Sequence, residues 1–384
     1  MHKAARKSIV NSWNEWDPLK HVIVGSVASR MTGAPDVGSV YEFPDAGIKA
    51  GEWKPIPQEV AQEAQEKMDA FADLMEKRGI LVDRPTPHPK LCSKVSTPDW
   101  EADWTFGCMP PRDLLLCYGN EILEATMSER SRWYDYLHYR PLLERYFQED
   151  PDFRWESAPK PRLTEETYVE GYWHNYYRVW THEQKMERMR AHQFHLTDKE
   201  PLFDAADIFR YGKDLFVQRS AVTAAPGINW LRRHFEPQGI RVHEVAFDGH
   251  PQPWHIDVSV ITPRPGLVIQ NPNEPPLTPE FHELFRKNGW EVVPAAPPAR
   301  TKPHPRSFCS VNLAYNTFTL APNVICVEAA EVRLMEQLDK LGVEVIPVDF
   351  FEVSPFGGGL HCSTLDIYRE GQCEDYFPKQ IKGF

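Results

Sequence analysis

One short segment near the C-terminus has the composition of a loop that presents a reactive side chain. Residues 357–364 read Gly-Gly-Gly-Leu-His-Cys-Ser-Thr, which places Cys362 after three glycines and a histidine. Glycine permits tight bends and the close approach of a ligand. An ionised cysteine beside a base can attack an electrophilic carbon. The alternative is that Cys362 is a small buried hydrophobic residue, as most free cysteines are.

Three further polar segments offer groups that could work with such a cysteine. In Trp254-His255-Ile256-Asp257, an extended strand would project His255 and Asp257 from one face, with the histidine available as a proton acceptor. Asp204 lies in Phe-Asp-Ala-Ala-Asp, where the alanines would let a ligand approach closely. Asp113 ends Pro-Pro-Arg-Asp, directly before an apolar run. Taken singly, each segment is equally well explained as a turn, a cap or a solvated strand edge.

The bulk composition narrows the class of protein. The chain has 384 residues, 41% of them hydrophobic and 12% aromatic, which is enough for a substantial core. A net charge of −12 argues against nucleic acid or an anionic membrane as the main partner and is compatible with a cationic small substrate. Seven cysteines without a C-x-x-C pair predict reduced thiols rather than a disulfide framework or zinc site. No signal peptide or membrane segment is evident, so we expect a soluble, cytoplasmic protein.

The chain repeats a pattern in which an amphipathic stretch ends at glycine and a β-rich segment follows. The glycines are Gly79, Gly239, Gly289 and Gly342, and a fifth, looser copy without glycine runs from 142 to 155. Glycine at this place is typical of a left-handed helix cap. The best helix candidate spans residues 59–77, and its apolar stripe consists of Val60, Ala64, Met68, Phe71 and Met75.

Two short strands around a turn are predicted ahead of each helix. The pairs are 114–118 with 122–124, 208–210 with 215–217, 258–262 with 267–269, and 318–320 with 324–327. The first unit contributes 21–24, whose partner strand is expected from the other end of the chain. Five strand-strand-helix-strand units favour radial repetition over the competing interpretation, a mixed α/β sheet in two domains. In a radial fold the first strands converge, so the candidate side chains above would meet in one central cavity.

These segments resemble the amidinotransferases, a family of the guanidine-modifying superfamily. The resemblance rests on 203–207, 254–257 and 357–362, and further matching segments run along the whole chain: Asn-Glu-Trp-Asp-Pro-Leu at 14–19, Thr-Pro-Asp-Trp at 97–100, Pro-Arg-Asp at 111–113, Arg-Ser-Arg at 130–132, Ala-Pro-Lys-Pro at 158–161 and Thr-Leu-Asp at 364–366. The resemblance implies a single catalytic domain over residues 1–384, folded as a five-bladed, pseudo-symmetric α/β propeller.

By this resemblance, Cys362 is the nucleophile, His255 the general acid and base, and Asp204 the residue that orients His255. Asp113 and Asp257 correspond to the carboxylates that bind the guanidinium group. Carboxylates would hold a guanidinium planar and in line with the sulfur, and a protonated amine leaves more readily. No metal or organic cofactor is implied. We expect His255 and the bound cation to lower the pKa of the thiol.

Several substrate-binding positions depart from the family pattern. Glu274 stands where the family has an arginine that binds a substrate carboxylate, and a carboxylate there would favour an amine. Gln252 and Trp254 replace an asparagine and a methionine that line the pocket. Arg306 and Ser307 lie where a serine contact is expected, so Arg306 is a candidate to replace the lost positive charge. These departures bear on substrate identity and leave the chemistry intact.

The resemblance therefore predicts transfer of an amidino group, with L-arginine as the expected donor, to a primary amine. The product would be ornithine, the intermediate an amidino-cysteine, and the setting specialised metabolism. Donor and acceptor are the expected partners, and dimers occur in the family. A guanidine hydrolase, such as a deiminase, would use water on the same scaffold. A catalytically silent propeller used for binding is the third possibility.

Overall fold

The fold is α/β, and its strands form small separate sheets. The computed structural model describes residues 8–27, 56–91, 94–103, 105–245, 254–272, 278–307 and 309–384. Within these ranges there are five three-stranded sheets and one two-stranded sheet, rather than the large mixed sheet of the competing interpretation. The two-stranded sheet pairs β3 (Val95–Ser96) with β4 (Glu101–Ala102).

The five three-stranded sheets share one pairing pattern. In each, one antiparallel pair is followed by one parallel pair, because a helix crosses over before the third strand. Four of the sheets are continuous in sequence: β5 (Leu115–Tyr118), β6 (Glu121–Glu124) and β7 (Arg154–Ser157); β8 (Ile208–Tyr211), β9 (Asp214–Gln218) and β10 (Arg241–Val245); β11 (Val260–Arg264), β12 (Leu267–Gln270) and β13 (Glu291–Pro294); and β14 (Phe318–Ala321), β15 (Val324–Glu328) and β16 (Glu344–Val348).

The fifth sheet joins the two ends of the chain. Strand β17 (Thr364–Arg369) pairs antiparallel with β1 (Leu19–Val24), and β1 pairs parallel with β2 (Leu81–Asp83). This confirms the prediction that the partner of the first strand comes from the other end. Cys362 lies two residues before β17, so the closure of this sheet fixes the C-terminal end of the cysteine loop in space.

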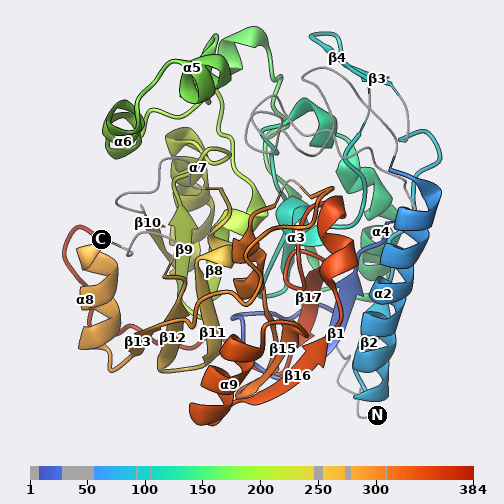
Figure 1. Cartoon of the computed structure of the whole chain (residues 1–384), viewed down its shortest axis with the longest axis vertical. Coiled ribbons are helices and arrows are strands. Elements are labelled where there is room, and N and C mark those ends of the chain that lie inside the picture. Colours follow the sequence, from blue (N-terminus) through green and yellow to red (C-terminus); the bar gives the residue numbers. More distant parts are fainter. Residues whose placement is uncertain are drawn as a thin grey trace.

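The helices lie mainly outside the sheets. Helix α2 (Gln58–Lys77) buries the predicted stripe against β1 and β14, with Val60 only partly buried. In Figure 1, α2, α8 and α9 lie at the periphery, whereas α3 and β17 lie nearer the middle. The remaining helices are α3 (Pro111–Leu114), α4 (Arg140–Glu149), α5 (Tyr172–Arg178), α6 (His182–Arg190), α7 (Ala225–Phe235), α8 (Pro279–Lys287) and α9 (Val332–Lys340). The four cap glycines have positive φ, as predicted.

One predicted strand is wrong at its start. Residues Ile256–Val258 form a 3-10 turn, η7, closed by the bond from the Ser259 N–H to the Ile256 carbonyl (2.9 Å), and β11 begins only at Val260. A short aspartate side chain at Asp257 favours such a turn over a ladder. His255 and Asp257 therefore do not share the face of a strand. Cys117, Cys326, Cys362 and Cys373 are free thiols, and no described helix is long and apolar enough to cross a membrane.

Candidate active site

The cysteine loop is shaped by glycines that pack directly against the thiol. It follows the 3-10 helix η9 (Phe351–Phe356), and Gly357 and Gly358 have φ of 105° and 152°. A Cβ at Gly358 would lie 2.6 Å from Cys362 Sγ and 2.4 Å from its Cβ. Only glycine permits this approach, so the sequence signal of a close backbone contact is confirmed. Cys362 itself is 4% exposed.

Replacing Gly358 by alanine should therefore displace the thiol. We expect at least about a tenfold loss of activity, because reacting atoms must be held within a fraction of an ångström. Gly342 is the matched control: it also has positive φ (77°), but a Cβ there meets nothing within 4 Å. In both variants, backbone strain should lower the free energy of unfolding by ~1–3 kcal/mol. Thermal denaturation should show that both variants fold, and steady-state kinetics should show the loss of activity in the Gly358 variant. An equal loss of activity in the two variants would contradict a specific displacement of the thiol.

His255 is bound by two aspartates from different parts of the chain. Its Nε2 lies 3.1 Å from Asp204 Oδ2, and its Nδ1 lies 3.8 Å from Asp113 Oδ1. Asp204 precedes the 3-10 turn Ala205–Asp207, and Asp113 lies on α3. Burial alone would lower the pKa of His255, but Asp113 and Asp204 raise it to about 10. The ring is therefore an imidazolium at neutral pH and can act as a general acid.

The thiol of Cys362 contacts a carboxylate and an amide rather than His255. Sγ donates a hydrogen bond to Asp257 Oδ2 (3.2 Å) and accepts one from Asn316 Nδ2 (3.2 Å). Burial, together with Asp257 and Asp113, raises the pKa of the thiol well above its usual range. The expectation that His255 lowers this pKa is wrong for the free protein, because the neighbouring charges are carboxylates that disfavour a thiolate.

Three buried carboxylates each keep one oxygen without a hydrogen bond. These oxygens are Oδ1 of Asp113, Asp204 and Asp257. Arg132 Nη1 donates to Asp113 Oδ2 (2.8 Å), and burial raises the pKa of Asp113. Burial opposes ionisation of Asp257 as well, but its hydrogen bond with His361 holds the pKa below the usual range. Unpaired carboxylate oxygens in a dry site are suited to accept N–H groups of a planar cation.

Four polar residues at the site had no role in the prediction from sequence. His361 Nδ1 lies 3.0 Å from Asp257 Oδ2, and its Nε2 lies 3.5 Å from Glu15 Oε2. Arg132 holds Asp113, and Asn316 contacts Cys362. The family-like segments at 14–19 and 130–132 contained Glu15 and Arg132, which was the available signal. Asn316 stood in no such segment.

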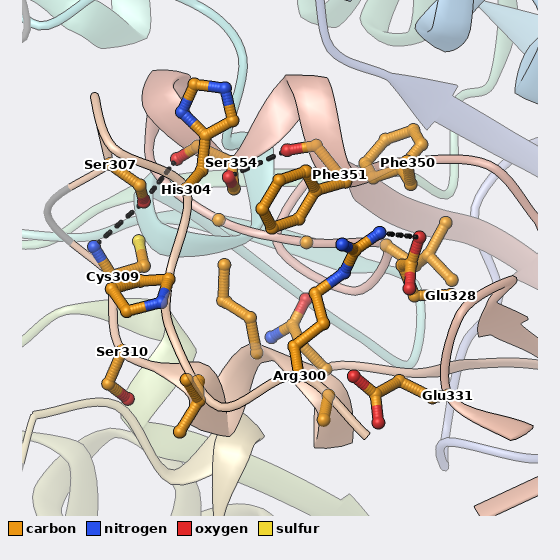
Figure 2. Close-up of a pocket in the computed structure, with 18 of the residues that line it drawn as sticks. Arg300, His304, Ser307, Cys309, Ser310, Glu328, Glu331, Phe350, Phe351 and Ser354 are labelled. Atoms are coloured by element: carbon orange, nitrogen blue, oxygen red, sulfur yellow. Dashed lines mark hydrogen bonds and ion pairs between the residues drawn. The ribbon is translucent and has the colours of Figure 1, made fainter. Parts of the chain in front are cut away.

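A pocket with an empty volume of about 510 Å³ lies beside the cysteine loop (Figure 2). Asn316, Gly358 and Gly359 line it, so it shares a wall with the site. Its other lining includes His304 and side chains with charges of both signs: Arg300, Lys302, Glu328 and Glu331. Figure 2 shows Arg300 directed towards Glu328 and beside Phe351. The Arg300 guanidinium lies 3.5 Å from the Glu328 carboxylate, and its carbon lies 3.7 Å from the centre of the Phe351 ring.

The remaining predicted substrate residues fall in different places. Ser307 is buried, lines the pocket and donates to the Ser354 carbonyl (3.1 Å), whereas Arg306 is exposed and is not part of the lining. Trp254 is half-buried next to His255 and lies 6.3 Å from the ring of Trp173 on α5. Gln252 and Glu274 lie outside the described residues.

Comparison with known proteins gives relatives along the whole chain. Glycine amidinotransferase, mitochondrial, from Xenopus tropicalis is 36% identical over 381 residues, covering 97% of this chain and 86% of that protein. L-arginine:L-lysine amidinotransferase from Pseudomonas savastanoi pv. phaseolicola is 34% identical over 380 residues, covering 96% and 97%.

The fold and the C-terminal region match as well. The solved structure of SxtG, an amidinotransferase of the saxitoxin biosynthetic pathway of Microseira wollei, superposes with a TM-score of 0.83 at 32% identity, covering 96% of this chain and 99% of that one. A family model described as arginine deiminase matches residues 256–369. The matched region includes Asp257, Asn316 and Cys362.

Proposed function

This chain belongs to the amidinotransferase family, and from that membership we propose that it moves an amidino group from L-arginine to a primary amine through a covalent bond to Cys362. The observation that carries the proposal is the meeting of a thiol, an imidazolium and three carboxylates with open oxygens in one buried site. We include in the proposal that residues 1–384 form one catalytic domain and that the five sheets are blades of a pseudo-symmetric propeller.

In the first half-reaction, Asp113 and Asp257 bind the guanidinium of the donor. The cation offsets the two carboxylates that disfavour a thiolate, so the thiol proton leaves to water as the cation enters. The sulfur electron pair then forms the bond to the amidino carbon. The carbon–nitrogen bond to ornithine breaks, and the departing nitrogen takes its proton from His255, which Asp204 orients.

In the second half-reaction, the acceptor amine replaces ornithine. Neutral His255 removes a proton from the amine as its nitrogen attacks the amidino carbon. The carbon–sulfur bond breaks, and its electron pair returns to Cys362. The product leaves as a guanidinium cation, the Cys362 thiolate regains its proton from water, and His255 is an imidazolium again, so the cycle is closed. In the specialised setting that we propose, the acceptor is an amine other than glycine.

We propose that the pocket in Figure 2 binds the remote end of an amino-acid substrate. Arg300 and Lys302 supply positive charge for a carboxylate, and Glu328 supplies negative charge for an ammonium group. Ser307 shapes this pocket, and Trp254 lies beside the entering amine. Gln252 and Glu274 stay in the proposal as selectors of substrate, on their sequence positions alone.

Replacing Arg300 by glutamine should raise the KM for arginine about five- to tenfold with little change in kcat. A hydrogen bond to a charged group contributes ~1.5–3 kcal/mol, less at a partly exposed site. Arg306→Gln is the matched control, because Arg306 is exposed outside the pocket. Steady-state kinetics of both variants decide the matter: a rise in KM for Arg306→Gln alone would assign the carboxylate to Arg306 instead.

Acceptor dependence tests the function itself. Without an amine the protein should form at most one equivalent of ornithine per active site, and continued formation should require an amine, so that a panel of amines then identifies the acceptor. The match of residues 256–369 to arginine deiminase favours one second candidate, a hydrolase that uses water. Release of citrulline and ammonia without any amine would establish that candidate and exclude the transferase.

A further inference from the structure

Asn316 makes a set of contacts that none of the roles above uses. It follows the 3-10 helix η8 (Val311–Tyr315) and is 2% exposed. Its Oδ1 accepts hydrogen bonds from the backbone N–H groups of His361 (2.9 Å) and Cys362 (3.1 Å). These two donors fix the orientation of the amide, since the opposite orientation would face N–H groups with N–H groups. Its Nδ2 must therefore point at the sulfur.

The Nδ2 group of Asn316 contacts both partners of the thiol hydrogen bond. It lies 3.2 Å from Cys362 Sγ and 2.9 Å from Asp257 Oδ2. The charged groups that face Cys362 are carboxylates, Asp257 from η7 and Asp113 from α3, and both disfavour a thiolate. Asn316 Nδ2 acts in the opposite sense, because it donates to sulfur.

We propose that Asn316 is a catalytic residue whose Nδ2–H stabilises the negative charge on Cys362 Sγ when the thiol ionises and again when the amidino group departs. This inference rests on the proposed function and adds a donor for sulfur that acts as the donors of an oxyanion hole do for oxygen. When the thiol proton leaves to water, Sγ no longer donates to Asp257. It keeps the hydrogen bond that it accepts from Asn316, and this bond is stronger to a thiolate. In the covalent intermediate the sulfur is neutral, so the hydrogen bond from Asn316 to sulfur is weaker. It is stronger in the thiolate that precedes the intermediate and in the thiolate that forms when the intermediate breaks down.

The contact can be tested without turnover, by measuring how fast iodoacetamide alkylates Cys362 as a function of pH. Mass spectrometry of the peptide that contains Cys362 separates this thiol from the other cysteines. Only the thiolate reacts. In Asn316→Ser, which is neutral and too short to reach sulfur, we expect alkylation below the thiol pKa to slow about tenfold, with the pH profile displaced upward by about one unit. Asn316→Asp, which keeps the oxygen that holds the two backbone N–H groups, should shift the profile in the same direction.

Asn312→Ser is the matched control, since it makes the same substitution on η8 itself, four residues away. Unchanged alkylation profiles in Asn316→Ser and Asn316→Asp, with folding shown by thermal denaturation, would overturn the proposal. So would an equal shift in Asn312→Ser. If Asn316→Ser fails to fold, an unchanged profile in Asn316→Asp still overturns the proposal. Failure of the proposed function would appear separately, as absence of an amidino adduct in the parent protein, whereas the alkylation measurement does not depend on transfer.

Discussion

Replacing Cys362 by alanine should lower ornithine formation by about four orders of magnitude or more, since no other group can carry the amidino carbon. Incubated with arginine and no acceptor, the parent protein should gain the mass of one amidino group on the peptide that contains Cys362. The alanine variant should gain none. Cys362 is the thiol in contact with Asp257 and Asn316. A Cβ added at Gly358 would clash with Cys362, and one added at Gly359 would press against Asn316.

The matched control for this experiment is Cys373→Ala, because Cys373 is a half-buried free thiol outside the cysteine loop. It should form the adduct at the parental rate. Unchanged turnover in Cys362→Ala would exclude the covalent mechanism. Absence of turnover and adduct in the parent itself, over a range of donors and amines, would instead favour the catalytically silent propeller.

The site was largely predictable where one residue type at one local spacing carried the signal. The three glycines before Cys362 predicted a close backbone approach, and Gly358 makes it. The apolar period of residues 59–77 predicted α2, and the orphan first strand predicted the pairing of β1 with β17. These features depend on backbone geometry and hydrophobic period, which are properties of a local sequence.

The electrostatics of the site could not be predicted in the same way. Three contacts of the site join residues that no spacing rule connects, because each pair is separated by a long stretch of chain. The pairs are Arg132 with Asp113, Asn316 with Cys362, and Glu15 with His361. His255 and a bound cation were expected to lower the pKa of Cys362. In the protein alone, burial and Asp257 raise this pKa, while His255 is held by Asp204 and Asp113. Both directions depend on which charges the fold places nearest, and that information lies in tertiary contacts.

The two histidines illustrate the same limit. His255 was expected on a strand beside Asp257, but the 3-10 turn η7 directs them to different partners: Asp204 for the histidine, Cys362 for the carboxylate. His361 had no assigned role in the prediction from sequence, yet it lies between Asp257 and Glu15. One change in local backbone therefore separates the acid for the leaving group from the carboxylate that holds the thiol.

Replacing His255 by glutamine should lower turnover with arginine by about 10²–10⁴-fold, the usual contribution of a general acid. Glutamine keeps an N–H that can donate to Asp204 but has no proton to give to the departing nitrogen of ornithine. The parent should lose kcat/KM with arginine as the pH rises through about 10, where the imidazolium deprotonates, because the protonated ring is the active form. The variant should lack this falling limb.

A donor with a different leaving group shows whether His255→Gln is slow because it cannot protonate the departing nitrogen. An S-methylisothiourea donor expels methanethiolate, which needs little protonation. Followed without an acceptor amine, the amidination of Cys362 by this donor should therefore slow less than about tenfold in His255→Gln. The matched comparison is Asn316→Ser, which acts on the attacking sulfur and should slow both donors equally. If His255→Gln slowed the two donors by the same factor, the histidine would act before the leaving group departs, as the base for Cys362. Its charged state between Asp204 and Asp113 argues for the acid, since an imidazolium has no lone pair to take the thiol proton.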